Sequence, residues 1–261
     1  MLKLFNISKT FNPGTITEKK ALKGIDLELD DGDFVTVIGG NGAGKSTLLN
    51  LIAGVHSTDT GSIFLDGLDL TDMPEFKRAK YLGRVFQDPM MGTAANMEIE
   101  ENLAMAMRRG KKRGLSWHIQ PSEEALYTEK LKLLDLGLEN RRTAKVGLLS
   151  GGQRQALTLL MATLQKPKLL LLDEHTAALD PKTARKVLEL TEQLVSQEHL
   201  TTFMVTHNMK DAIRYGNRLI MMMEGRIVYD VRGEEKKNLK VEDLLAKFSL
   251  AGEMNDKLLL G

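Results

Sequence analysis

The chain has 261 residues, 42% of them hydrophobic and 27% charged, with a net charge of +1. This balance is that of a globular protein with a sizeable core, and it gives no global field that would attract nucleic acid. Cysteine is absent, which excludes disulfides and cysteine-based metal sites. No run approaches the ~18 apolar residues of a membrane-spanning helix. Residues 1–7 lack the apolar run of a secretion signal.

The first third of the chain predicts short strands joined by turns. Alternating or β-branched residues mark the strands Leu2–Ile7, Leu22–Leu29, Phe34–Ile38 and Ser62–Leu65. The last of these is followed by Asp66-Gly67, which is typical of a hairpin. Lys45–Ala53 predicts a helix that Gly54 ends. Phe34–Ile38 has the character of a buried strand, because it is continuously apolar apart from one threonine.

The middle of the chain, from Met97 to Leu138, has a helical pattern with Met- and Leu-rich faces. It contains a basic loop, Arg108–Gly114. We interpret this loop as a solvated segment, and contact with a phosphate-bearing surface is the alternative. The methionines 105 and 107 are interpreted as residues that pack in the core or in a groove, rather than as part of a cofactor site.

The last third returns to alternating strands and helices. The expected helices are Leu149–Leu164, Pro181–Gln197 and Met209–Tyr215, and the expected strands are Lys168–Leu172, Thr201–Val205, Leu219–Met223 and Arg226–Tyr229. The tail over residues 231–261 is charged and holds a short amphipathic stretch at Val241–Phe248. We find no internal repeat and no low-complexity segment.

A phosphate-binding loop is predicted between the strand Phe34–Ile38 and the helix Lys45–Ala53. It fits the pattern G-x-x-x-x-G-K-[ST] and comprises Gly39, Gly40, Asn41, Gly42, Ala43, Gly44, Lys45, Ser46 and Thr47. The glycines let successive backbone N–H groups point at a phosphate, and the helix N-terminus adds partial positive charge. Lys45 is expected to contact the β- and γ-phosphates of a nucleotide, and Ser46 to ligate Mg²⁺.

Two carboxylates, Asp173 and Glu174, follow the apolar run Leu169–Leu172. Ligands of parallel sheets bind at the carboxyl ends of strands, where these side chains emerge. Beside a phosphate-binding loop, Asp173 is expected to hold Mg²⁺ through water, and Glu174 to orient or deprotonate an attacking water. An acidic strand end that faces solvent is the alternative.

A second phosphate-binding surface is predicted at Leu149-Ser150-Gly151-Gly152-Gln153. Ser150 can cap the helix that follows, and the two glycines leave the backbone open. Because the first loop contacts a triphosphate on only one side, this segment is expected to face the nucleotide of another protomer. A simple capped helix is the alternative.

In these ordered motifs the chain resembles the ATP-binding-cassette (ABC) ATPases from about Met1 to Asp230. Leu149–Gln153 matches the LSGGQ signature, and Leu169–Glu174 matches Walker B with its catalytic glutamate. The resemblance implies that Gln87 is the Q-loop residue, which senses Mg²⁺ and water, and that His207 is the switch histidine, which contacts the γ-phosphate. The resemblance also implies that Asp180, in Ala178-Leu179-Asp180, belongs to the D-loop. It implies that Phe11 stacks on adenine, and a core residue is the alternative at that position.

The resemblance implies an α/β fold of the P-loop NTPase class, with a RecA-like core and a mainly parallel sheet. An antiparallel β subdomain is expected in the N-terminal part, and an inserted α-helical subdomain at about residues 88–150. The ATPase domain is expected over residues 1–230 and a tail with a short helix over 231–261. The family commonly has proline after the catalytic glutamate, whereas this chain has His175, which adds an N–H group and a titratable ring near the site.

The implied function is an ATP-hydrolysing subunit that binds ATP and Mg²⁺ and pairs head to tail with a second copy or a sister ATPase. It would sit peripherally on the cytoplasmic face of the cell membrane and drive separate permease subunits, fed indirectly by an extracellular binding protein. Import of a small solute, such as an amino acid, is the favoured interpretation. An exporter or lipoprotein-extraction motor and a soluble ABC protein acting on nucleic acid or ribosomes are the alternatives.

Overall fold

The computed structural model describes residues 1–111 and 119–260, and describes only the backbone of residues 251–260. The chain forms two compact units, one of Met1–Pro74 with Thr201–Gly261 and one of Glu75–Leu200. Residues 112–114 of the predicted basic loop lie outside the described residues. No helix among the described residues is long and apolar enough to cross a membrane.

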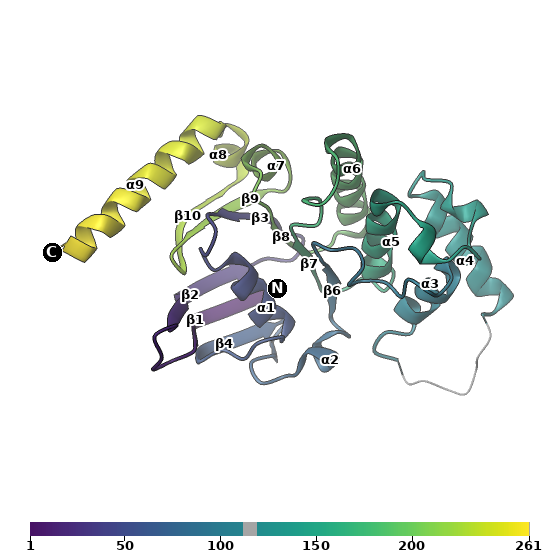
Figure 1. The fold of residues 1–261 in the computed structure, drawn as a ribbon, viewed down its shortest axis with the longest axis horizontal. Helices are drawn as coiled ribbons and strands as arrows, with labels where there is room; N and C mark the ends of the chain where they lie inside the picture. The colour runs from purple at the N-terminus through teal and green to yellow at the C-terminus, as the bar shows by residue number, and fades with distance from the viewer. Residues whose placement is uncertain (112–118, 261) are drawn as a thin grey trace. The chain divides into compact units, whose positions relative to one another are not determined.

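An antiparallel sheet forms the N-terminal part of the first unit (Figure 1). Its strands are β1 (Leu2–Phe11), β2 (Lys19–Leu29), β4 (Thr60–Leu65) and β5 (Leu68–Asp69), in the order β2-β1-β4-β5. Strand β1 is longer than the predicted Leu2–Ile7 because its pairing with β2 continues as far as Phe11. The predicted hairpin after Leu65 is present as the β4–β5 pair.

The same unit holds a second group of strands in the order β10-β9-β3-β8. These are β3 (Phe34–Gly39), β8 (Thr202–Val205), β9 (Arg218–Met223) and β10 (Arg226–Arg232). Strand β3 runs parallel to both β8 and β9, whereas β10 is antiparallel to β9. The helices of this unit are α1 (Lys45–Ala53), α7 (Met209–Arg214), α8 (Gly233–Lys237) and α9 (Val241–Leu260).

A buried cluster joins these strands to α7 and α9. Ile38, Leu219 and Val231 from the strands contact Ala212 of α7 and Leu244 of α9. The amphipathic stretch at Val241–Phe248 was expected to be a short helix, but α9 continues to Leu260. The amphipathic pattern shows only the part of a helix that packs on a core, while strong helix formers and the absence of proline let the backbone continue beyond it.

The second unit combines a parallel strand pair with helices. Its elements are β6 (Leu82–Val85), β7 (Leu169–Asp173), α2 (Glu75–Arg78), α3 (Ile99–Met107), α4 (Pro121–Lys132), α5 (Gly151–Thr163), α6 (Pro181–Glu198) and 3₁₀ turns at Leu138–Asn140 and Val146–Leu148. The helical pattern over 97–138 corresponds to α3 and α4, the second beginning at Pro121. Strand β6 was not predicted, because Gly83 and Arg84 interrupt its apolar residues.

Helices α5 and α6 lie side by side and pack closely near their N-termini (Figure 1). A Cβ atom built on Gly152 of α5 would lie 2.1 Å from Thr183 Cγ2 of α6, whereas one on Gly151 would lie 3.5 Å from Leu179 Cδ2. The first distance is a severe overlap, and a β-branched threonine has little rotamer freedom to relieve it. The second is an ordinary van der Waals contact. Gly152 is therefore required for close packing of the two helices.

We predict that Gly152→Ala lowers the free energy of unfolding by about 1–3 kcal/mol, because overpacking forces α5 and α6 apart. Gly151→Ala is the matched control and should cause no loss, since alanine favours a helix over glycine and its methyl group finds space. Urea-induced unfolding followed by circular dichroism measures both. Equal destabilisation by the two variants would contradict the packing role of Gly152.

Candidate functional site

The predicted phosphate-binding loop connects β3 to α1 in the first unit. Gly44 is the N-cap of α1 and has a left-handed backbone, with φ of 101°. A Cβ atom there would lie 2.7 Å from the Ala21 carbonyl oxygen, so glycine is required by both conformation and space. Because no side chain caps α1, the N–H groups of its first turn are left for another acceptor.

Lys45 lies over this loop. Lys45 is 7% exposed, and its ammonium donates hydrogen bonds to the carbonyl oxygens of Gly39, at 2.8 Å, and Gly40, at 3.2 Å. The hydroxyl-bearing residue Ser46 is exposed beside it. One turn therefore holds an uncapped helix N-terminus, a buried lysine and an exposed serine. These groups suit the binding of a phosphate with its metal ion.

His207 reaches the same edge of the sheet as this loop. Strands β3 and β8 are parallel neighbours, with Val37 opposite Val205. Their carboxyl ends therefore emerge together, and the loop follows one strand while His207 follows the other. His207 is exposed, and Asn208 after it caps α7 by accepting from the Lys210 and Asp211 N–H groups.

Phe11 ends strand β1 and is half-buried rather than part of the core. Its ring meets the His56 ring edge to face, with centroids 5.3 Å apart, and Lys9 Nζ lies 5.9 Å from its centroid. A partly exposed ring in this position is available for stacking, and its contact with adenine stays a prediction.

In the second unit, Gln87 and the two carboxylates emerge at one edge. Strands β6 and β7 are parallel neighbours, with Val85 opposite Leu172, so Gln87 and Asp173-Glu174 follow adjacent carboxyl ends. Asp173 is partly buried, and its carboxylate lies 3.9 Å from the Arg84 guanidinium. Burial lowers the pKa of Arg84, whose guanidinium also stacks on the Phe86 ring at 4.4 Å.

Glu174 has an unusual backbone conformation, with φ of 44° in the left-handed region. Its carbonyl oxygen accepts from the Ala177 N–H at 2.9 Å, so residues 174–177 form a turn. His175, which replaces the family's common proline, is 2% exposed and its Nε2 lies 3.1 Å from Thr191 Oγ1 of α6. Burial lowers the pKa of His175 to about 4. The ring is therefore neutral at neutral pH and sits in the packed interior.

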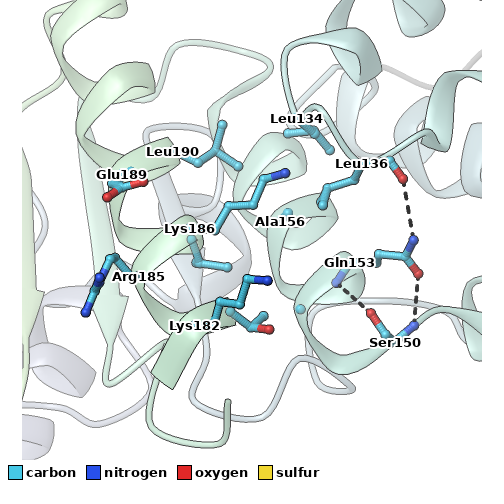
Figure 2. A pocket seen from close by; sticks show the side chains of 13 residues that line it. Leu134, Leu136, Ser150, Gln153, Ala156, Lys182, Arg185, Lys186, Glu189 and Leu190 are labelled. Carbon is cyan, nitrogen blue, oxygen red and sulfur yellow. Dashed lines mark hydrogen bonds between the residues drawn. The ribbon is translucent and has the colours of Figure 1, made fainter. Parts of the chain in front are cut away.

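Ser150 is the N-cap of α5, as the sequence predicted. Its hydroxyl accepts from the Gln153 N–H at 3.2 Å, and Gln153 Oε1 accepts from the Ser150 N–H at 3.1 Å (Figure 2). Gln153 Nε2 also reaches the Leu136 carbonyl oxygen at 3.5 Å. This capping box satisfies two donors of the segment and fixes its shape.

A pocket of about 550 Å³ lies beside this segment. Figure 2 shows Leu134, Leu136 and Ala156 on one side of it, and Lys182, Arg185 and Lys186 of α6 on the other. At the start of α6, Asp180 accepts from the N–H groups of Lys182 and Thr183, each at 3.1 Å. Hydrogen bonds from Thr183 lower the pKa of Asp180, and its carboxylate caps this helix through one oxygen.

Two supporting residues were missed from the sequence. Arg154 is 9% exposed, and its guanidinium donates to the carbonyl oxygens of Val146 at 3.1 Å and Gly147 at 3.0 Å, which holds the turn before Ser150. Gln155 is fully buried and donates to the Phe86 carbonyl oxygen at 3.1 Å, next to Gln87. Both follow directly after Gln153, but a polar residue on a helix is usually solvated, so no sequence signal pointed to these roles.

The candidate residues thus fall into two groups. The first unit contains the phosphate-binding loop, Phe11 and His207. The second contains Gln87, Asp173, Glu174, Ser150–Gln153 and Asp180. Within each unit, adjacent parallel strands bring residues distant in the sequence to one edge. This is the arrangement in which α/β proteins bind nucleotides.

Comparison with known proteins agrees with this chemistry. The family model described as ABC transporter matches residues 22–177. The tyrosine transport ATP-binding protein of Clostridioides difficile (strain R20291) is 46% identical over 256 residues, which cover 96% of this chain and 100% of that protein. The phosphonates import ATP-binding protein PhnC 2 of Synechococcus sp. (strain JA-2-3B'a(2-13)) is 36% identical over 88% of this chain and 84% of its own length.

Solved structures share the fold. A dimeric structure of the ATP-binding cassette MJ0796, in a post-hydrolysis state bound to ADP and Pi, matches with a TM-score of 0.74 at 31% identity, over 89% of this chain and 98% of that one. The ADP conformation of the cassette MJ1267 matches with a TM-score of 0.78 at 28% identity, over 95% and 98%. These neighbours confirm the predicted α/β P-loop NTPase fold. The family match spans more than half of the residues, and the chain therefore belongs to the ABC transporter family as an ATP-binding cassette that hydrolyses ATP.

Proposed function

We propose that this cassette is the ATPase subunit of an importer for a small solute, with an amino acid as the favoured class. The relative at 46% identity over its full length is named for tyrosine transport, and another is named for phosphonate import. These names favour import over export and over a soluble role on nucleic acid. The observation that carries the nucleotide chemistry is the uncapped start of α1 under the buried Lys45.

Within this proposal, the loop Gly39–Thr47 and Lys45 bind the triphosphate, and Phe11 stacks on adenine. Ser46, Asp173 and Gln87 hold Mg²⁺, which supplies charge neutralisation on the phosphate oxygens when bound. Hydroxyl, carboxylate and amide oxygens are ligands that suit this hard cation. The exposed Ser46 and the partly buried Asp173 support this assignment.

Glu174 is the proposed base or orienting group for the attacking water, and His207 contacts the γ-phosphate. Glu174 follows the strand end directly, on a turn that its carbonyl closes with Ala177. A carboxylate placed by a rigid turn can act on water with little loss of orientation. The proposal assigns nucleotide binding chiefly to the first unit and water activation to the second.

We further propose that two copies, or one copy with a sister ATPase, pair head to tail. In this arrangement Ser150–Gln153 and Asp180 of one protomer face the nucleotide that the other protomer binds. The exposed Ser150 and Gly151 at the start of α5 support the assignment, as does the dimeric state of the MJ0796 cassette. Hydrolysis would remove the γ-phosphate that both surfaces contact and so release the pair.

Glu174→Gln should keep ATP binding but reduce hydrolysis by at least about 100-fold, because the variant cannot take a proton from water. ATP should then trap a dimer. Lys45→Ala should instead weaken ATP binding itself, since the phosphate charge loses its partner. Steady-state ATPase assays, nucleotide-binding titrations and size-exclusion chromatography with ATP and Mg²⁺ separate the two effects. Normal turnover in either variant would refute the assigned role.

The membrane partner is proposed to bind the helical part of the second unit, which would hold the cassette at the cytoplasmic face of the membrane. Three methionines there are exposed although apolar: Met90 at 47%, Met91 at 69% and Met105 at 43%. Methionine adapts to varied apolar partners and is common at binding surfaces. Gln87, which is proposed to sense Mg²⁺ and water, directly precedes residues 88–110. A permease segment that docks at these residues would therefore respond to a conformational change at Gln87. An extracellular binding protein would act indirectly, through that permease.

A photo-crosslinking amino acid at position 91 should therefore capture a permease subunit in native membranes. Position 16 is the matched control, because Ile16 is also an exposed apolar residue but lies in the first unit. Immunoblotting and mass spectrometry identify the captured protein. Capture of the permease from position 16 and not from position 91 would contradict the proposed docking surface.

A further inference from the structure

Two linked, buried hydrogen bonds connect His175, the residue after Glu174, to helix α6. His175 Nε2 lies 3.1 Å from Thr191 Oγ1, and Thr191 Oγ1 lies 2.8 Å from the Val187 carbonyl oxygen one turn earlier. His175 is 2% exposed and Thr191 is 0% exposed. Both hydrogen bonds are therefore shielded from solvent. If either is lost, water does not replace it.

The direction of each hydrogen bond follows from the groups present. A carbonyl oxygen only accepts, so the single hydroxyl proton of Thr191 is donated to Val187. Thr191 Oγ1 must then accept from His175, which means that Nε2 carries the proton of the neutral ring. Thr191 thus selects one tautomer and one orientation of the His175 imidazole.

The hydrogen bond between His175 and Thr191 affects Glu174 because Glu174 and His175 share a peptide bond. Glu174 has φ of 44°, a left-handed conformation that is unfavourable for a residue with a Cβ atom. Such a conformation persists only where its surroundings determine it. The Ala177 N–H holds the carbonyl of Glu174 at 2.9 Å. On the other side of this peptide bond, the hydrogen bond from the His175 ring to Thr191 fixes His175.

We propose that His175, held by Thr191, is a positioning residue that sets the orientation of the Glu174 carboxylate for water attack. The inference rests on the proposed role of Glu174 as base. It accounts for the buried hydrogen bond between His175 and Thr191. Because His175 is 2% exposed, its loss should alter turnover rather than nucleotide binding.

The test is the variant Thr191→Val, which keeps the shape of the side chain but removes the acceptor for His175. We expect kcat for ATP hydrolysis to fall about tenfold while KM for ATP stays within about twofold, because misorientation affects the chemical step and binding lies with Lys45. Thr191→Ser retains the hydroxyl and should restore kcat to near the wild-type value. The assays are run well below the unfolding temperature of each variant.

The matched control is Thr163→Val on α5. Thr163 is also a buried threonine whose hydroxyl donates to helix carbonyl oxygens, Leu159 at 3.0 Å and Leu160 at 3.1 Å, but it has no histidine partner. This variant reports what loss of a buried hydroxyl does to stability alone, and its kcat should stay at the wild-type value. A fall in kcat equal to that of Thr191→Val would overturn the proposal.

Nuclear magnetic resonance of ¹⁵N-histidine-labelled protein gives an independent readout. The wild type should show His175 as the Nε2-protonated tautomer with slow proton exchange, and Thr191→Val should lose that protection. If Thr191→Val does not fold, His175→Gln, which keeps an N–H donor, is compared with His175→Leu, which has none. Equal kcat values in those two variants, or in Thr191→Val and wild type, would overturn the proposal.

The result is separable from the proposed function. If Glu174→Gln abolishes hydrolysis while Thr191→Val leaves kcat unchanged, only the positioning role fails. If Glu174→Gln hydrolyses ATP normally, the role of Glu174 fails first.

Discussion

Parallel strands release their carboxyl ends at one edge of a sheet, and the candidate site depends on this constraint. In the first unit it brings the loop after β3 and His207 after β8 to neighbouring positions. In the second unit it does the same for Gln87 after β6 and the carboxylates after β7. The apolar strands contribute no chemistry themselves, but their burial gives the polar residues at their ends a rigid support. The pairing register of the parallel strands therefore determines which candidate residues lie next to each other.

The sequence predicted the parts of the molecule where local signals agree with tertiary structure. The helix Lys45–Ala53 was predicted with its observed bounds, because a glycine precedes it and another follows it. The capping role of Ser150 was also confirmed. The motif residues themselves could be found because their spacing reflects backbone geometry near a phosphate, which tolerates little variation.

The rest could not be predicted because it depends on what packs against each residue. Strand β6 has a glycine and an arginine among four residues, and only its pairing with β7 makes it a strand. His175 was expected as a titratable ring near the site, yet it is buried against α6, with its pKa lowered to about 4. Arg154 and Gln155 look like surface residues in the sequence, although Arg154 donates to the Val146 carbonyl oxygen and Gln155 to that of Phe86.

The contact between Gly152 and Thr183 carries a mechanical consequence. Because a methyl group on Gly152 would overlap Thr183, the start of α5 and the start of α6 are in close contact. Ser150 caps one of these helices and Asp180 caps the other. The packing therefore links the two caps, so that a shift of one helix start presses on the other.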